Sequence, residues 1–166
     1  DIAYLDQTDA LPRTDYCSVN NRCHECVAKA LSQLKAGVTM IFEPSAEDPV
    51  LHINSKRVVQ VLQHLLHNAA KFTVEGEIIL TYTCRIPERT MLFTISDTGP
   101  GIPAEKQEAV FERFVKLDTF AQGTGLGLPV CRLIAAKLGG SLRVDSSYTE
   151  GCRMIFEVPF GLPEEI

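Results

Sequence analysis

The sequence lacks any apolar segment that approaches the length of a membrane-spanning helix, and no signal peptide opens it. It also lacks a long basic run, and its formal net charge is −5. An acidic chain without a basic tract is not typical of a protein whose main partner is nucleic acid. We therefore expect neither direct membrane insertion nor nucleic-acid binding. Internal repeats and low-complexity tracts are absent too.

The sequence also lacks a second pair of Cys or His residues that could complete a zinc site. Cys23 and Cys26 have metal-like spacing, but no Cys or His pair follows at a zinc-like distance, so we expect no metal there. Cys84 lies on the apolar side of a strand pattern and Cys131 in a helix pattern, which favours buried free thiols. The cysteines are Cys17, Cys23, Cys26, Cys84, Cys131 and Cys152.

What is present suits one globular domain: 166 residues, 45% of them hydrophobic and 22% charged. The chain begins at Asp1 rather than Met, so we expect a piece of a longer protein. Apolar periodicity predicts helices at 19–36, 104–110 and 126–138, and a further helix that begins after a cap at Asn54 or Ser55. Strands are predicted at 38–42, 50–53, 77–86, 91–97, 142–148 and 152–159, and irregular structure at 1–16. This order predicts a two-layer α/β sandwich, with helices on one face of a mixed sheet.

A carboxylate ends one strand on its apolar face. Met91, Phe93 and Ile95 alternate onto one side of the strand, and Asp97 continues that side. A buried carboxylate is costly without a hydrogen-bond donor. The exocyclic amine of adenine is one such donor; alternatively, Asp97 caps the turn that follows it.

Three glycines, at 123, 125 and 127, precede the helical pattern of 126–138. Glycine admits a close backbone approach, and the free N–H groups at a helix N-terminus favour anions. The run therefore predicts a phosphate cradle. It is not a Walker loop, because no Gly-Lys-Ser/Thr sequence follows.

The helix that follows Asn54 carries a polar face opposite its apolar stripe. Gln60, His64, Asn68 and Lys71 recur three or four residues apart and fall together on this face. Alone, the pattern is typical of a solvated helix face. Beside two glycine-rich loops, it indicates a nucleotide site.

Four motifs follow one another in the chain: HNAAKFT at 67–73, DTGPGIP at 97–103, FERF at 111–114 and GTGLGL at 123–128. Taken together, they resemble the motifs of the catalytic and ATP-binding domain of bacterial sensor histidine kinases. This family belongs to the wider superfamily of gyrase, chaperone, kinase and mismatch-repair ATPases. The resemblance covers about residues 18–160 and implies a Bergerat-type fold, a mainly antiparallel sheet covered on one face by about three helices.

The resemblance implies ATP and Mg²⁺ as cofactors. Asn68 matches the magnesium ligand, Lys71 a phosphate contact and Asp97 the adenine-binding carboxylate. Phe111 and Phe114 match the hinge of a lid at 116–122. The implied nucleotide-binding residues are Asn68, Lys71, Asp97, Gly99, Gly101, Ile102, Phe114, Gly123, Thr124, Gly125, Leu126 and Gly127.

The implied catalytic residues are Asn68, Lys71, Lys116 and His64. Lys116 stands where many members carry Arg, and a cation there would steady the transferring phosphoryl group. His64 stands where hydrolysing members place a Glu that activates water. A neutral imidazole can act as a base, but the exchange favours phosphoryl transfer to a protein histidine over hydrolysis.

The acceptor motif of the family is not recognisable in this chain. The single His-Glu pair, His24-Glu25, lies in the first predicted helix without the Arg and Pro of that motif. We therefore expect the acceptor histidine on a separate dimerisation domain, with a response regulator receiver domain as the downstream partner.

The resemblance also implies a domain division and a cytoplasmic location. Residues 1–17 would be a tail from the dimerisation region, 18–160 the ATP-binding domain and 161–166 a C-terminal tail. Two alternatives stay open, a gyrase-like or chaperone-like ATPase and a non-catalytic nucleotide-binding module.

Overall fold

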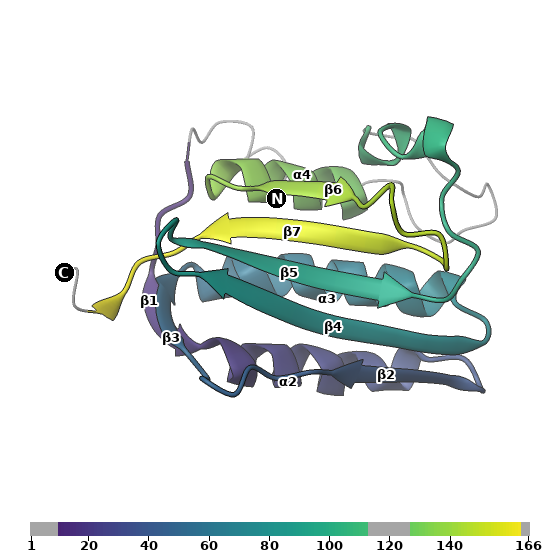
Figure 1. Ribbon diagram of the computed structural model, residues 1–166, viewed down its shortest axis with the longest axis horizontal. Coiled ribbons are helices and arrows are strands. Elements are labelled where there is room, and N and C mark those ends of the chain that lie inside the picture. The colour runs from purple at the N-terminus through teal and green to yellow at the C-terminus, as the bar shows by residue number, and fades with distance from the viewer. Residues whose placement is uncertain (1–9, 113–126, 164–166) are drawn as a thin grey trace.

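The computed structural model describes residues 10–112 and 127–163. Within these ranges, a five-stranded sheet in the order β2-β4-β5-β7-β6 forms one layer, and the α-helices pack behind it (Figure 1). The helices are α2 (Val19–Ala30), α3 (Ser55–Phe72) and α4 (Gly127–Lys137). The strands are β2 (Val38–Phe42), β4 (Gly76–Arg85), β5 (Thr90–Asp97), β6 (Ser141–Val144) and β7 (Arg153–Pro159).

Strand direction confirms the mixed, mainly antiparallel sheet. β2 runs parallel to β4, whereas β4 with β5, β5 with β7 and β6 with β7 are antiparallel. A second, two-stranded sheet joins β1 (Asp15–Ser18) to β3 (Val50–Ile53). With helices on one face of the larger sheet, the two-layer α/β sandwich is as predicted.

The core lies between α3 and the inward face of the sheet. Asn54 caps α3 by accepting a hydrogen bond from the backbone N–H of Arg57 at 3.2 Å. The apolar stripe of α3 is buried as its spacing predicts. Phe93 of β5 and Phe156 of β7 stack against each other with ring centroids 5.7 Å apart. The buried stripe of α3 consists of Val58, Val61, Leu62, Leu65, Leu66, Ala69 and Ala70.

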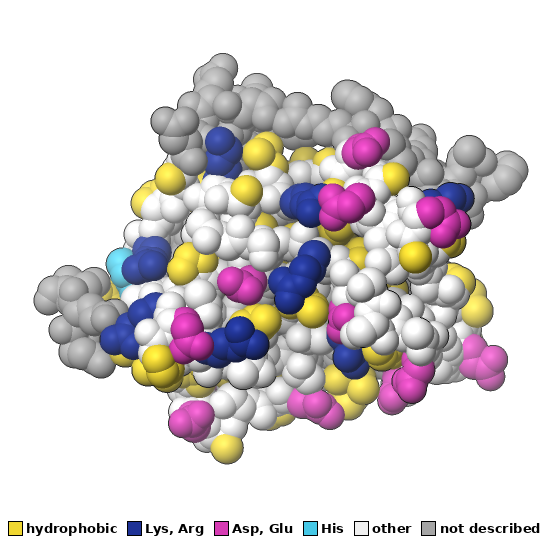
Figure 2. Space-filling model, turned by 45° about the horizontal axis from the view of Figure 1, so that its top comes forward, with side chains coloured by type: hydrophobic (Ala, Val, Ile, Leu, Met, Phe, Trp, Pro, Cys, Tyr) yellow, Lys and Arg dark blue, Asp and Glu magenta, His cyan; other side chains and the backbone are white. Residues whose placement is uncertain are grey.

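The opposite face of the sheet is turned away from the helices. Acidic and basic side chains are interspersed across the side of the molecule shown in Figure 2, and the apolar side chains there form only small patches. Among the described residues, no helix combines the length and apolar character required to cross a membrane.

The first part of the chain differs most from prediction. Residues 15 and 16 were expected to be irregular but belong to β1, which pairs with a strand about 35 positions further along. Asp15 also accepts hydrogen bonds from the backbone N–H and hydroxyl of Ser55, and Leu11 is buried. Such long-range pairing leaves no local periodic pattern.

Three other elements differ from prediction. α2 ends at Ala30 and gives way to a 3₁₀ turn, η1 (Leu31–Gln33), where Leu31 is 49% exposed. The short helix predicted at 104–110 is instead two 3₁₀ turns, η2 (Ala104–Lys106) and η3 (Ala109–Phe111). The strand predicted to reach residue 148 ends at Val144, because a turn begins at Asp145.

We expect Leu62→Ala to lower the free energy of unfolding by about 2–5 kcal/mol, since Leu62 is fully buried and its truncation leaves a cavity. Leu31→Ala is the control, because Leu31 is half exposed; its effect should stay within about 0.5 kcal/mol. Urea unfolding of both variants measures the difference. Similar losses in the two variants would contradict the position of the core.

Candidate nucleotide-binding site

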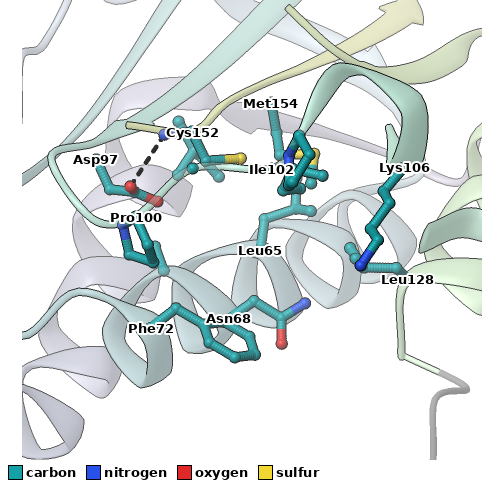
Figure 3. Close-up of a pocket in the computed structure, with 14 residues that line it drawn as sticks. Leu65, Asn68, Phe72, Asp97, Pro100, Ile102, Lys106, Leu128, Cys152 and Met154 are labelled. Atoms are coloured by element: carbon teal, nitrogen blue, oxygen red, sulfur yellow. Dashed lines mark hydrogen bonds between the residues drawn. The ribbon is translucent and has the colours of Figure 1, made fainter. Parts of the chain in front are cut away.

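A cavity of about 280 Å³ lies between α3, the C-terminal end of β5, the loop that follows it and the start of α4 (Figure 3). Its walls are mostly apolar. Asp97 lies toward one end, whereas Lys106 lies toward the other, and Asn68 faces the space from α3. The lining residues are Leu65, Asn68, Ala69, Phe72, Ile95, Asp97, Pro100, Gly101, Ile102, Pro103, Lys106, Leu128, Cys152 and Met154.

Asp97 lies on the core face of β5, as its alternation with Met91, Phe93 and Ile95 predicts. Its side chain is 7% exposed. Oδ1 accepts hydrogen bonds from the backbone N–H of Gly99 at 2.9 Å and of Cys152 at 3.1 Å. Both bonds end on Oδ1, which leaves Oδ2 without a bond from the residues that the structure describes. Asp97 therefore both caps the turn, the alternative interpretation of the sequence, and presents an oxygen at the cavity.

Burial sets the protonation balance of this carboxyl. It raises the pKa of Asp97 above its ordinary value, and the two backbone N–H donors partly offset that rise. The site thus contains a carboxylate whose charged form is destabilised until another donor reaches it.

The glycines of the first motif are held by close packing. Gly101 has φ +75°, and a Cβ there would lie 2.8 Å from the carbonyl oxygen of Gly151. Gly99 lies beside the hydroxyl of Thr73, which is buried without a hydrogen-bond partner among the described residues. The loop from Asp97 to Gly101 is therefore fixed against the turn that precedes β7.

Lys106 is a site residue that the motifs missed. It lines the cavity from η2 at the same end as Asn68 (Figure 3). Lys71, the predicted phosphate contact, lies outside the lining, with Nζ 5.8 Å from the ring centroid of Phe72. The sequence offered one signal for Lys106: the helix predicted at 104–110 begins directly after the first glycine motif, and its first turn lies over the cavity.

His64 lies beside the start of α4 rather than in the lining. A Cβ at Gly127 would be 3.6 Å from His64 Nδ1, which places the imidazole against the end of the second glycine run. Burial, and secondarily the charge of His67, lower the pKa of His64. Its imidazole is therefore neutral at neutral pH.

Several predicted site residues lie outside the described ranges, and the structure says nothing of them. Phe111 of the predicted hinge is described and buried, with the Arg132 guanidinium carbon 4.4 Å from its ring centroid. Arg132 also pairs with both carboxylate oxygens of Glu108, at 2.9 and 3.0 Å. The residues outside the described ranges are Phe114, Lys116, Gly123, Thr124, Gly125 and Leu126.

The cysteines are free thiols, as predicted; four are buried, but Cys84, which was also expected to be buried, is partly exposed, as is Cys152. The buried ones are Cys17, Cys23, Cys26 and Cys131. Burial raises the pKa of Cys26 to about 12. Within residues 10–112 and 127–163, no group of three or more His, Cys, Asp or Glu side chains is placed to hold a metal ion. A metal at this site would therefore depend on ligands other than such a cluster.

A sequence profile of the histidine kinase-, DNA gyrase B- and HSP90-like ATPases matches residues 53–162. The chain belongs to this family. The match includes Asn68, Asp97 and both glycine runs, and so includes the cavity described above.

The family relatives include sensor kinases. The chain is 40% identical over 114 residues to the adaptive-response sensory kinase SasA of Thermosynechococcus vestitus. This match covers 67% of this chain and 30% of that protein. It is also 40% identical over 107 residues to the sensor protein SrrB of Staphylococcus aureus. That match covers 62% of this chain and 18% of SrrB. The chain therefore spans less than a third of each of these relatives.

Solved structures of the family share the fold. Full-length ShkA in complex with AMPPNP superposes with a TM-score of 0.86 at 26% identity, covering 96% of this chain and 34% of that one. The catalytic domain of histidine kinase ThkA, nucleotide-free, gives a TM-score of 0.74 at 29% identity, covering 92% of this chain and 98% of that one. The second match spans nearly the whole ThkA domain.

Asp97→Asn should be at least as stable as the parent at neutral pH, because Asn keeps an acceptor oxygen but removes a buried charge. The folded-state pKa of Asp97 is raised, so the folded chain binds more protons than the unfolded chain between the two pKa values. The contribution of Asp97 to the free energy of unfolding therefore falls as the pH rises from the unfolded-state pKa to the folded-state pKa. The advantage of Asn should shrink as the pH is lowered toward about 4. Urea midpoints across this range measure it.

Asp145→Asn is the matched control with the opposite sign. A hydrogen bond from the Ser147 side chain holds the pKa of Asp145 below its ordinary value. Its contribution to stability is therefore present at neutral pH and is lost as pH falls through the lowered pKa. If Asp97→Asn were instead clearly less stable than the parent at neutral pH, burial would not be the dominant influence on Asp97.

Proposed function

We propose that this chain is the ATP-binding catalytic domain of a sensor histidine kinase in a two-component system. It would transfer the γ-phosphoryl group of Mg-ATP to a histidine on a separate dimerisation domain. The observation that carries the proposal is the cavity itself, with a buried carboxylate at one end and an amide and an ammonium at the other. A nucleotide has the complementary polarity, with an amine on its base and negative charge on its phosphates.

Adenine would occupy the end of the cavity that contains Asp97. Oδ2 is the oxygen that would accept from the exocyclic amine, and a hydrogen bond to a charged group is stronger than one between neutral groups. Ile102, Phe72 and Met154 line the adjoining space, where an aromatic base can exclude water. Gly99 and Gly101 place no side chain of their own beside the base.

The phosphates would extend toward Asn68 and Lys106. An amide oxygen suits Mg²⁺, and Asn68 is the candidate ligand of the described residues; phosphate oxygens and water would complete the shell. When bound, the ion would neutralise charge on the β- and γ-phosphates. Lys71, Lys116 and Gly127 remain candidates for phosphate contacts, together with Gly123, Thr124, Gly125 and Leu126.

Phosphoryl transfer is favoured over hydrolysis by the residue beside the second glycine run. His64 stands there as a neutral imidazole, where a hydrolase of the superfamily would place Glu. SasA and SrrB, to which the chain is similar, are named as a sensory kinase and a sensor protein. The partners proposed are therefore a histidine phosphoacceptor domain and, downstream, a receiver domain, in the cytoplasm.

A gyrase-like or chaperone-like ATPase is the second candidate, because a neutral His64 is itself a competent base. Steady-state release of phosphate by the chain alone separates the two. Fast turnover that His64→Ala abolishes would favour the hydrolase.

The isolated chain should bind Mg-ATP without stable autophosphorylation, because no acceptor motif is present. Transfer requires the γ-phosphate and an acceptor imidazole within attacking distance. Adding the dimerisation and phosphoacceptor domain of the parent protein should produce acid-labile label on that domain, followed with γ-labelled ATP. Label on the isolated chain that His24→Ala removes would overturn the domain assignment.

Lys106→Gln should weaken binding more for ligands with more phosphates. We expect about a three- to tenfold loss for ATP, a smaller loss for ADP and none for adenosine, because a charge-assisted contact at an exposed site such as Lys106 is worth roughly 0.7–1.4 kcal/mol. Calorimetry with the three ligands measures the series. Lys71→Gln tests the other ammonium, and Lys29→Gln on the exposed side of α2 is the control. Equal losses for adenosine and ATP would exclude a phosphate contact.

A further inference from the structure

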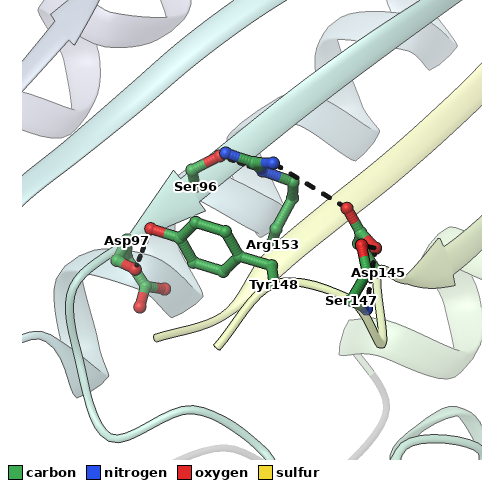
Figure 4. Close-up of polar contacts among 6 residues, drawn as sticks. All are labelled: Ser96, Asp97, Asp145, Ser147, Tyr148 and Arg153. Carbon is green, nitrogen blue, oxygen red and sulfur yellow. Dashed lines mark hydrogen bonds and ion pairs between the residues drawn. The ribbon is translucent and has the colours of Figure 1, made fainter. Parts of the chain in front are cut away.

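A polar cluster lies across the sheet from the cavity, at the same end of β5 (Figure 4). Its centre is Tyr148, from the turn between β6 and β7. The Tyr148 hydroxyl donates a hydrogen bond to the backbone carbonyl of Asp97 at 3.1 Å. Tyr148 does not line the cavity, yet it hydrogen-bonds to the backbone of Asp97, whose carboxylate faces the cavity.

The peptide of Asp97 is held from two further directions. Its N–H donates to the carbonyl of Cys152 at 2.8 Å. Gly151 packs so closely that a Cβ there would overlap the carbonyl oxygen of Asp97. Because the carbonyl and the side chain leave the same Cα, fixing the first restricts the direction of the second.

Arg153 holds Tyr148 in place. Its guanidinium carbon lies 4.2 Å from the Tyr148 ring centroid, a cation–π contact. Its Nε donates to the hydroxyl of Ser96 at 2.7 Å, and Nη1 lies 3.8 Å from Asp145 Oδ2. Asp145 in turn accepts from the backbone N–H and hydroxyl of Ser147, which fixes the turn that carries Tyr148.

Strand pairing does not require this cluster. β5 is already paired along its length with β4 on one side and β7 on the other. Arg153 and Asp145 are partly exposed, so their ion pair contributes little to stability. The bond from Tyr148 to Asp97 is the one contact in the cluster that ends on a residue of the cavity.

We propose that Tyr148, held by Arg153, is a positioning residue for the base-binding carboxylate of Asp97. The inference rests on the proposed function, since it concerns how Asp97 selects an adenine amine. Tyr148 is not among the residues that line the cavity, and it acts through the main chain at the end of β5. Loss of its hydroxyl would let the Asp97 peptide tilt and would loosen the aim of Oδ2 at the base.

The test is Tyr148→Phe in the 166-residue chain, because it removes the hydroxyl and keeps the ring on Arg153. We expect ATP to bind about two- to tenfold more weakly, the range of one neutral hydrogen bond. The preference for ATP over inosine triphosphate, which lacks the amine, should shrink by a similar factor, with little change in the urea midpoint. Tyr16→Phe is the matched control: Tyr16 is exposed and stacks on His52 at 4.6 Å, and it should change neither.

Arg153→Met tests the indirect role. It should reduce the same preference, and the double variant with Tyr148→Phe should lose no more than the larger single loss, because both act on one bond. Additive losses would mean that Arg153 acts separately and would overturn its part in the proposal.

Asp97→Asn separates this inference from the proposed function. If it weakens ATP binding while Tyr148→Phe leaves both nucleotides at parental affinity, positioning is wrong and the proposed function stands. Equal weakening of both nucleotides by Tyr148→Phe, with a lower urea midpoint, would make Tyr148 a structural residue only. A parent chain that binds no ATP overturns the proposed function and this inference with it.

Discussion

The hydrogen bonds that Asp97 Oδ1 accepts from Gly99 and Cys152 are the contacts on which the site depends. They join the end of β5 to the glycine loop that leaves it and to the start of β7, which is distant in the sequence. Without them a carboxylate could not remain charged on the core face of a strand. With them, the loop that follows is held in the conformation that forms one wall of the cavity.

The scaffold explains why this position is rigid. β5 lies between β4 and β7, so both of its edges are paired. Phe93 stacks on Phe156 behind it, and Ile95 precedes Asp97 on the buried face. A functional group at the end of such a strand is placed more accurately than one on a loop, because neighbouring strands fix its backbone.

Much of this arrangement could be predicted from local patterns. Period-two alternation placed Asp97 on the core face, helical spacing identified the buried stripe of α3, and cap chemistry narrowed the start of that helix to Asn54 or Ser55, of which Asn54 is the cap. These signals are local, since each depends on residues within a few positions of one another.

The features that sequence reasoning missed depend on long-range packing. β1 forms only because β3 is available to pair with it, and Asp15 is held by Ser55. Lys106 reaches the cavity because the chain turns back after the glycine loop, and Tyr148 reaches Asp97 because a surface turn folds across the end of the sheet. No motif marks any of these placements, and the one local signal is the helix predicted at 104–110, which puts Lys106 directly after the glycine loop.

Ser96 and Asp97 show how one strand end can serve both faces of the sheet. Side chains alternate along a strand, so Asp97 points toward the cavity while Ser96 points toward Arg153 on the other side. The two residues are neighbours in the chain, so a contact made by Ser96 on the solvent side acts on the residue next to the one that carries the carboxylate. Burial of Asp97 destabilises the charged folded chain, and a base amine would relieve that cost by supplying the missing donor to Oδ2. The same constraint that lowers the stability of the free domain thus increases its preference for a ligand with an amine, a trade between stability and function that is expected at binding sites.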